Sequence, residues 1–197
     1  LNEIRCTNMN ETIETIRQRR SIRHYSTKAV PGELLDLIVE CGQLAPSGRG
    51  GQNWHFTVVT DRGVLDQITA ANREMMLSCG DPTEIKFAEE PDFDNFRAAP
   101  AAIIVSVDDS QKWSMVDCAN AMTTMAIAAQ SLGLSSCYIV SFARAVNAPK
   151  HPELPVLLQI PDGWRAQFAL CLGYGDLAPH DRAPRRTDAV NYVGPRT

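Results

Sequence analysis

Apolar positions follow two periods along the chain, which predicts helices interleaved with strands. Apolar residues at helical spacing predict helices over 10–20, 31–44 and 114–133, another after Asp61 and a short one after Pro152. Short apolar or β-branched runs predict strands over 54–60, 101–107, 134–140 and 168–172. The run over 101–107 is apolar almost throughout, as expected of a strand buried on both faces. This order of elements indicates one α+β or α/β domain.

Three regions lack this regularity. The segment 78–95 is acidic and contains two prolines without a sustained period, which is typical of a lid or binding loop. We expect residues 1–9 to be a flexible extension. Residues 174–197 form a polar tail that is expected to wrap over the body or over a second subunit. Since no linker separates two parts, residues 1–197 are predicted to form a single domain.

Composition limits the classes of function. The formal net charge of −4 and the pI near 5.6 argue against nucleic acid as the main partner. No apolar run approaches the ~20 residues that span a bilayer, and the first ten residues contain no secretory apolar region. The six cysteines are scattered singly, without histidines at metal-ligand spacing. We therefore expect a reduced, cytoplasmic protein without a membrane anchor or a metal.

Two stretches carry candidate chemistry. Arg19-Arg20-Ser21-Ile22-Arg23 concentrates three guanidiniums and a hydroxyl, a donor set suited to phosphate. The same cations also suit the C-terminal end of a solvated helix, so these residues alone leave both readings open. Residues 45–53 form a glycine-rich loop ahead of a predicted strand. The chain has no G-x-S-x-G nucleophile elbow and no G-x-G-x-x-G after a strand, which excludes two common enzyme signatures.

The order and spacing of six motifs resemble the nitroreductase family of FMN oxidoreductases, over roughly residues 12–192. The motifs are Arg19-Arg20-Ser21-Ile22-Arg23-x-Tyr25, Ala45-Pro46-Ser47 with Gln52-x-Trp54-x-Phe56, Ala99-Pro100, Gly133-Leu134 with Cys137, Ile160-Pro161-x-Gly163-Trp164, and Leu172-Gly173-Tyr174-Gly175. The resemblance implies a three-layer α/β/α fold of the α+β class with a central, mostly antiparallel sheet. It also implies a homodimer with FMN at the subunit interface.

The resemblance also implies which residues bind the cofactor. Arg19, Ser21 and Arg185 would hold the FMN phosphate, and Arg23 would lie at the N1–C2 carbonyl edge of the flavin. Pro46 and Ser47 of the partner subunit would lie against the ring, while Gln52 would hold that loop or the polar edge of the ring. Backbone N–H groups near residues 139–141 would face flavin N5. The full expected set is Arg19, Arg20, Ser21, Arg23, Pro46, Ser47, Gly48, Gln52, Ile139, Val140, Ser141, Arg185 and Arg186.

The activity implied by the resemblance is ping-pong hydride transfer from NAD(P)H, through the flavin, to nitroaromatic, quinone or related small acceptors. The cofactor carries the chemistry, so no side-chain acid or base is expected. Alternatives are a flavin-degrading or dehalogenating enzyme and a non-catalytic flavin-binding protein. The family loop usually reads A-P-S-x-x-N-x-Q-P-W, whereas this chain has Gly50 at the Asn position and Asn53 at the Pro position. We expect this departure to affect acceptor preference more than flavin binding.

Overall fold

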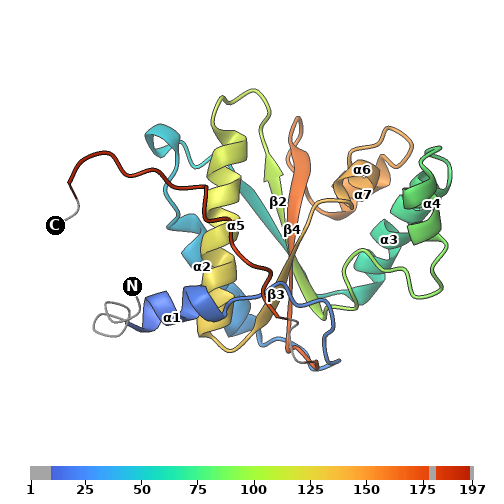
Figure 1. Ribbon diagram of the computed structural model, residues 1–197. Coiled ribbons are helices and arrows are strands. Elements are labelled where there is room, and N and C mark those ends of the chain that lie inside the picture. The colour runs from blue at the N-terminus through green and yellow to red at the C-terminus, as the bar shows by residue number, and fades with distance from the viewer. Residues whose placement is uncertain (1–9, 178–180, 196–197) are drawn as a thin grey trace.

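A four-stranded antiparallel sheet organises the chain, and the computed structural model describes residues 10–177 and 181–195 (Figure 1). The predicted extension of residues 1–9 lies outside the described residues. In sheet order the strands are β1 (His55–Val59), β2 (Ala101–Val107), β4 (Arg165–Gly173) and β3 (Ser135–Ile139). Every neighbouring pair is antiparallel. The predicted antiparallel α+β fold is confirmed.

Helices cover both faces of the sheet and make three layers (Figure 1). One face carries α2 (Gly32–Gln43) and α5 (Ser114–Ser131), with α1 (Glu11–Gln18) packed against α5. The other face carries α3 (Arg62–Leu77), α6 (Ala143–Val146) and α7 (Glu153–Leu157), while α4 (Pro82–Ala88) packs against α3.

The central strand β2 supplies side chains to two separate cores. Ile103 and Val105 join the core under α2 and α5, whereas Ala102 and Ile104 join the core under α3 and α6. Because successive side chains of a strand point to opposite faces, an apolar run can fill both cores at once. All seven residues of β2 are buried, which confirms the predicted double-sided burial.

The structure corrects two local expectations. The segment 78–95 contains the helix α4, whose N-cap Asp81 accepts hydrogen bonds from the backbone N–H groups of Thr83 and Glu84. Its 7 residues are too few to show a sustained apolar period in the sequence. The spacing Ser114-x-x-Asp117 predicts a capping box at the start of α5. This box is absent, because the Ser114 hydroxyl donates to the carbonyls of Asp108 and Gln111 instead.

Two kinds of feature are absent from the described residues. None of their helices combines the length and the apolarity required to cross a bilayer. In the same ranges, no group of three or more histidine, cysteine or acidic side chains is placed to hold a metal ion.

Candidate functional site

The arginine segment, residues 19–26, runs beside the edge strand β3. Arg19 adopts an extended conformation where α1 ends, and the Ile22 N–H then donates to the Ser136 carbonyl at 2.9 Å. Ser21 forms a parallel bridge with Ser136, and Tyr25 forms an antiparallel bridge with Gly175. These main-chain bonds fix the segment against the sheet without using its arginine side chains.

Tyr25 anchors the far end of the arginine segment. Its buried hydroxyl donates to the Ile22 carbonyl at 2.7 Å, and burial raises the pKa of the phenol far above its ordinary value. Gly173 makes room for this ring, since a Cβ there would lie 2.7 Å from Cδ of Pro100 and 2.9 Å from Cδ1 of Tyr25. Three of the sequence motifs therefore meet at one packing contact.

The tail brings a second group of arginines to the first. Arg182 donates to the carbonyls of Arg17 and Arg19, at 2.7 and 2.9 Å, where α1 ends. A cation at a helix C-terminus satisfies free carbonyls and suits the helix dipole. Desolvation and three neighbouring guanidiniums lower the pKa of Arg182 below its ordinary value. These neighbours are Arg185, Arg20 and Arg19.

This arginine cluster, Arg19, Arg20, Arg182 and Arg185, gathers like charges in one place. Among residues 10–177 and 181–195, no carboxylate forms an ion pair with Arg19, Arg182 or Arg185. Arg186 differs, because Asp188 accepts two hydrogen bonds from its guanidinium, each 2.9 Å long. Several guanidiniums in one place offer many donors to an anion with several oxygens, so the cluster fits a phosphate group.

Positive charge also reaches the middle of β3. Burial raises the pKa of the Cys137 thiol, and the charges of three arginines act in the opposite direction. These are Arg23, Arg97 and Arg19. Arg97 was not predicted as a site residue, and nothing in the local pattern separates it from a surface arginine. It follows Asp94, whose carboxylate accepts a hydrogen bond from the Ala98 N–H at 2.6 Å and holds a turn in which Arg97 and Ala98 have positive φ.

The C-terminal end of β3 lies on the same edge of the sheet. Ile139 is buried, Val140 and Ser141 are exposed, and the Ser141 hydroxyl donates to Oδ1 of Asn95 at 3.3 Å. Ile139 follows Ser136 by three residues, so about 10 Å separates it from the position of Ser21 along the strand. The structure thus places the arginine segment and residues 139–141 along one line.

Two buried asparagine side chains, Asn72 and Asn95, are hydrogen-bonded to each other next to Ser141. Oδ1 of Asn95 also accepts from Nδ2 of Asn72 at 3.2 Å, and both asparagine side chains are buried. Within the described part of the chain, Nδ2 of Asn95 and Oδ1 of Asn72 have no hydrogen-bond partner. These two residues were missed because their burial depends on the packing of α3 against residues 92–99.

The glycine-rich loop, residues 45–53, is pinned by the first turns of α5. Buried Asp117 accepts hydrogen bonds from the Gly48 N–H at 2.7 Å and from Nδ2 of Asn53 at 3.0 Å. Asn120 adds a bond from its Nδ2 to the Pro46 carbonyl at 3.0 Å. Asn53, the residue that replaces the family proline, therefore contributes directly to holding the loop.

Within the loop, Ser47 and Gln52 are also connected. The Ser47 hydroxyl accepts a hydrogen bond from the Gln52 N–H at 3.2 Å. Arg49 and Gln52 adopt positive φ values of 57° and 49°, which non-glycine residues rarely do. The loop is therefore a defined and locally strained structure rather than a flexible link.

The structure does not bring the loop and the arginine segment together within one chain. The loop contacts the N-terminal turns of α5, whereas α1 and β3 lie near its C-terminal end (Figure 1). With 18 residues, α5 is about 27 Å long. Pro46, Ser47, Gly48 and Gln52 therefore lie toward the opposite end of α5 from α1 and the start of the arginine segment.

Comparison with known proteins shows the family to which this chain belongs. The sequence profile of the Nitroreductase family matches residues 16–174. The chain belongs to the nitroreductase family. It is 32% identical over 186 residues to a protein of Methanothermobacter thermautotrophicus provisionally named NADH dehydrogenase/NAD(P)H nitroreductase, covering 87% of this chain and 85% of that protein.

Two further nitroreductase-family comparisons extend this result. The chain is 30% identical over 197 residues to an NAD(P)H-dependent FMN reductase of Bacillus subtilis, with 93% of this chain and 74% of that protein covered. A crystal structure of a Bacteroides fragilis nitroreductase with bound FMN superposes with a TM-score of 0.89 at 29% identity. That match covers 94% of this chain and all of the other.

Proposed function

We propose that this chain is an FMN-dependent oxidoreductase that uses NAD(P)H to reduce nitroaromatic, quinone or related small acceptors. The family, the FMN reductase relative and the FMN-bound crystal structure support this proposal. The observation that carries it is the meeting of two arginine groups that come from opposite ends of the sequence. FMN bound there would accept a hydride at N5 and pass it on, which is chemistry that protein side chains do not supply.

The residues of the chain would bind and orient the cofactor. Arg19, Arg20 and Arg185, together with the Ser21 hydroxyl, would donate to the phosphate. Arg186 is a weaker candidate, since Asp188 already accepts its donors. Arg23 would place a positive charge at the polar edge of the ring, and backbone groups of residues 139–141 would face its reacting nitrogen. The ~10 Å from Ser21 to Ile139 is a distance that a ribityl phosphate can bridge.

The proposed active form is a homodimer with composite sites. The glycine-rich loop of the partner subunit would close each site with Pro46, Ser47, Gly48 and Gln52. Within one chain this loop lies at the N-terminal end of α5, away from the arginine segment. Exposed apolar side chains support association, because α1 carries Ile13 and Ile16, which are 39% and 48% exposed. Every described residue of 181–195 is also exposed, and we propose that this tail of the single domain reaches over the second subunit.

The redox function is tested by anaerobic titration of the purified protein with NADH and NADPH while the visible spectrum is recorded. We expect a yellow protein that bleaches at about one nicotinamide per flavin, as a single two-electron transfer requires. A protein that stays yellow would contradict the nicotinamide-dependent activity. A colourless protein that cannot be reconstituted with FMN would overturn the cofactor as well.

The composite site is tested by mixing two inactive variants. Arg19→Glu should disable the part of the site that the arginine segment forms. Ser47→Trp should disable the part that the glycine-rich loop forms. If each site takes one half from each chain, a mixed dimer has one site with both defects and one intact site. After random subunit exchange we expect roughly a quarter of wild-type activity to return, since half of the dimers are mixed. A mixture that remains inactive, although mass spectrometry shows mixed dimers, would contradict the composite arrangement.

A further inference from the structure

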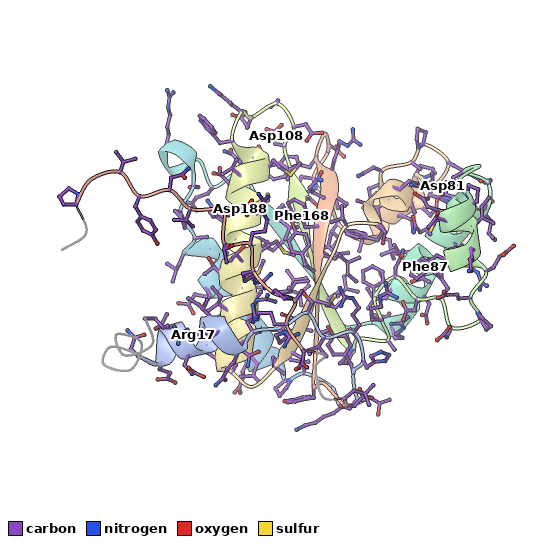
Figure 2. The ribbon with its side chains drawn as sticks, viewed as in Figure 1. Arg17, Asp81, Phe87, Asp108, Phe168 and Asp188 are labelled. Atoms are coloured by element: carbon purple, nitrogen blue, oxygen red, sulfur yellow. The ribbon has the colours of Figure 1, made fainter. Side chains whose placement is uncertain are left out.

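A hollow of about 310 Å³ lies between the glycine-rich loop and the start of α5, and it shares only Gly48 with the proposed flavin site. Asp108, labelled in Figure 2, marks the turn that leads into this helix. The lining contains two cations, an indole and two amide side chains but no carboxylate. It consists of Gly48, Arg49, Gly51, Asn53, Gln111, Lys112 and Trp113.

The indole of Trp113 forms a flat apolar wall of this pocket. It is 42% exposed, although Trp is usually well buried, and it is fixed from one side by the loop. A Cβ on Gly48 would lie only 2.7 Å from Cδ1 and Cγ of the ring, so the loop backbone packs directly against it. Nζ of Lys112 lies 4.7 Å from the ring centre. The pocket thus places a partly exposed indole beside positive charge.

The cations of the pocket are not neutralised by acids. Among the described residues, neither Arg49 nor Lys112 forms an ion pair with a carboxylate. The neighbouring acids are engaged elsewhere: Asp117 binds the loop, Asp109 lies 3.6 Å from Arg165, and Asp108 accepts from the Ser110 N–H. The loop also holds Arg49 in a left-handed conformation, a strained state of the kind found at ligand sites.

We propose that this pocket binds the adenosine 2′-phosphate end of NADPH, and this inference rests on the proposed function. A phosphomonoester carries a charge of about −1.5 to −2 at pH 7 and is matched by two cations, while an indole suits a flat base. NADPH carries such a phosphate next to adenine, and NADH does not. A pocket of about 310 Å³ is at the small end of ligand sites, so it holds a fragment of the dinucleotide.

The first test measures binding without turnover. Adenosine 2′-monophosphate is titrated into the FMN-loaded protein by calorimetry, with adenosine 5′-monophosphate and adenosine as reference probes. We expect the 2′-phosphate to bind most tightly, and Arg49→Gln and Lys112→Gln each to weaken it about tenfold, the least that losing a charge-assisted hydrogen bond costs. Lys86→Gln, which removes an exposed lysine on α4, is the matched control.

The second test compares the two nicotinamides in steady-state kinetics. The ratio of kcat/KM for NADPH to that for NADH should fall about tenfold in Arg49→Gln and in Lys112→Gln but not in Lys86→Gln. Equal binding of the 2′- and 5′-phosphates, or a ratio that neither substitution changes, would overturn the proposal while leaving the oxidoreductase intact. If the protein oxidised neither nicotinamide, the proposed function would fail, and the calorimetric comparison would still decide what the pocket binds.

Discussion

The two halves of the proposed site are built in opposite ways. The arginine half consists of extended chain at a sheet edge, with partly exposed arginines and tail residues 181–195 that are all exposed. The loop half is tied to a buried carboxylate at the start of α5. The first half gathers charge that the fold itself does not need, whereas the second is part of the packing of its own chain. Substitutions should therefore reduce cofactor affinity in one half and stability in the other.

The largest effect is expected from charge reversal in the arginine half. Arg19→Glu should weaken FMN binding by about 100- to 1,000-fold, because a charge-assisted hydrogen bond of ~1.5–3 kcal/mol is replaced by repulsion. The free energy of unfolding of the FMN-free protein should change by less than about 0.5 kcal/mol, as for most surface substitutions. Equilibrium dialysis and urea unfolding measure the two quantities, with Lys86→Glu as the control. Unchanged FMN affinity would remove Arg19 from the site.

Removing Asp117, the buried acid of the loop half, should reduce stability rather than cofactor affinity. Asp117→Ala leaves the Gly48 N–H and the Asn53 amide without their partner, so we expect the free energy of unfolding to fall by about 2–4 kcal/mol. Urea unfolding of the FMN-free protein is the measurement. Asp109→Ala is the control, since its exposed pair with Arg165 is 3.6 Å long and should be worth less than about 1 kcal/mol. Equal losses in the two variants would show that Asp117 does not anchor the loop.

The same contrast explains what could be predicted from the sequence. The strands, the main helices and the arginine motif follow from local periods and side-chain chemistry, whereas the antiparallel sheet was expected from the family resemblance, and the fold was confirmed. The roles of Asn95, Arg97 and Asp117 depend on partners distant in sequence, so no local pattern identifies them. Asp117 was assigned to a capping box because its spacing from Ser114 allowed it, and tertiary hydrogen bonds took precedence. The residue roles toward FMN and the dimer remain predictions.

A smaller effect concerns the pH dependence of stability in the loop half. Burial, and then the charge of Asp117, raise the pKa of the Cys118 thiol to about 12, and its Sγ lies 3.4 Å from the Asn53 carbonyl. The folded state thus keeps this proton up to about pH 12, whereas the unfolded chain loses it near pH 9. Stability from this group is therefore complete below pH 9 and declines by about 1.4 kcal/mol per pH unit above it.

Urea unfolding between pH 8.5 and 10.5 measures this decline. Wild type should lose stability more steeply than Cys118→Ser, and the difference between the two curves removes the contribution of all other groups. Burial also raises the pKa values of Tyr25 and Cys137, but these groups add the same slope to both curves and therefore cancel in the difference. Parallel curves for wild type and variant would show that Cys118 does not keep its proton in the folded protein.

The smallest effect concerns the position where this chain departs from its family. Gly50→Asn should alter relative turnover of nitroaromatic and quinone acceptors by about two- to fivefold, the scale of one neutral hydrogen bond, and leave FMN content unchanged. The structure accommodates the change: Gly50 has a φ of 69°, which Asn tolerates better than most residues, and no atom lies within 4 Å of a Cβ there.

Gly80→Asn is a matched control for this substitution. Gly80 has a φ of 80° and equally open surroundings, but it lies at the turn before α4 rather than in the glycine-rich loop. Both variants should have the same free energy of unfolding as the wild type. A difference in acceptor preference between them would therefore be due to the location of the asparagine and not to a change in stability. If Gly50→Asn and Gly80→Asn both gave the acceptor profile of the wild type, position 50 of the loop would not determine which acceptor is reduced.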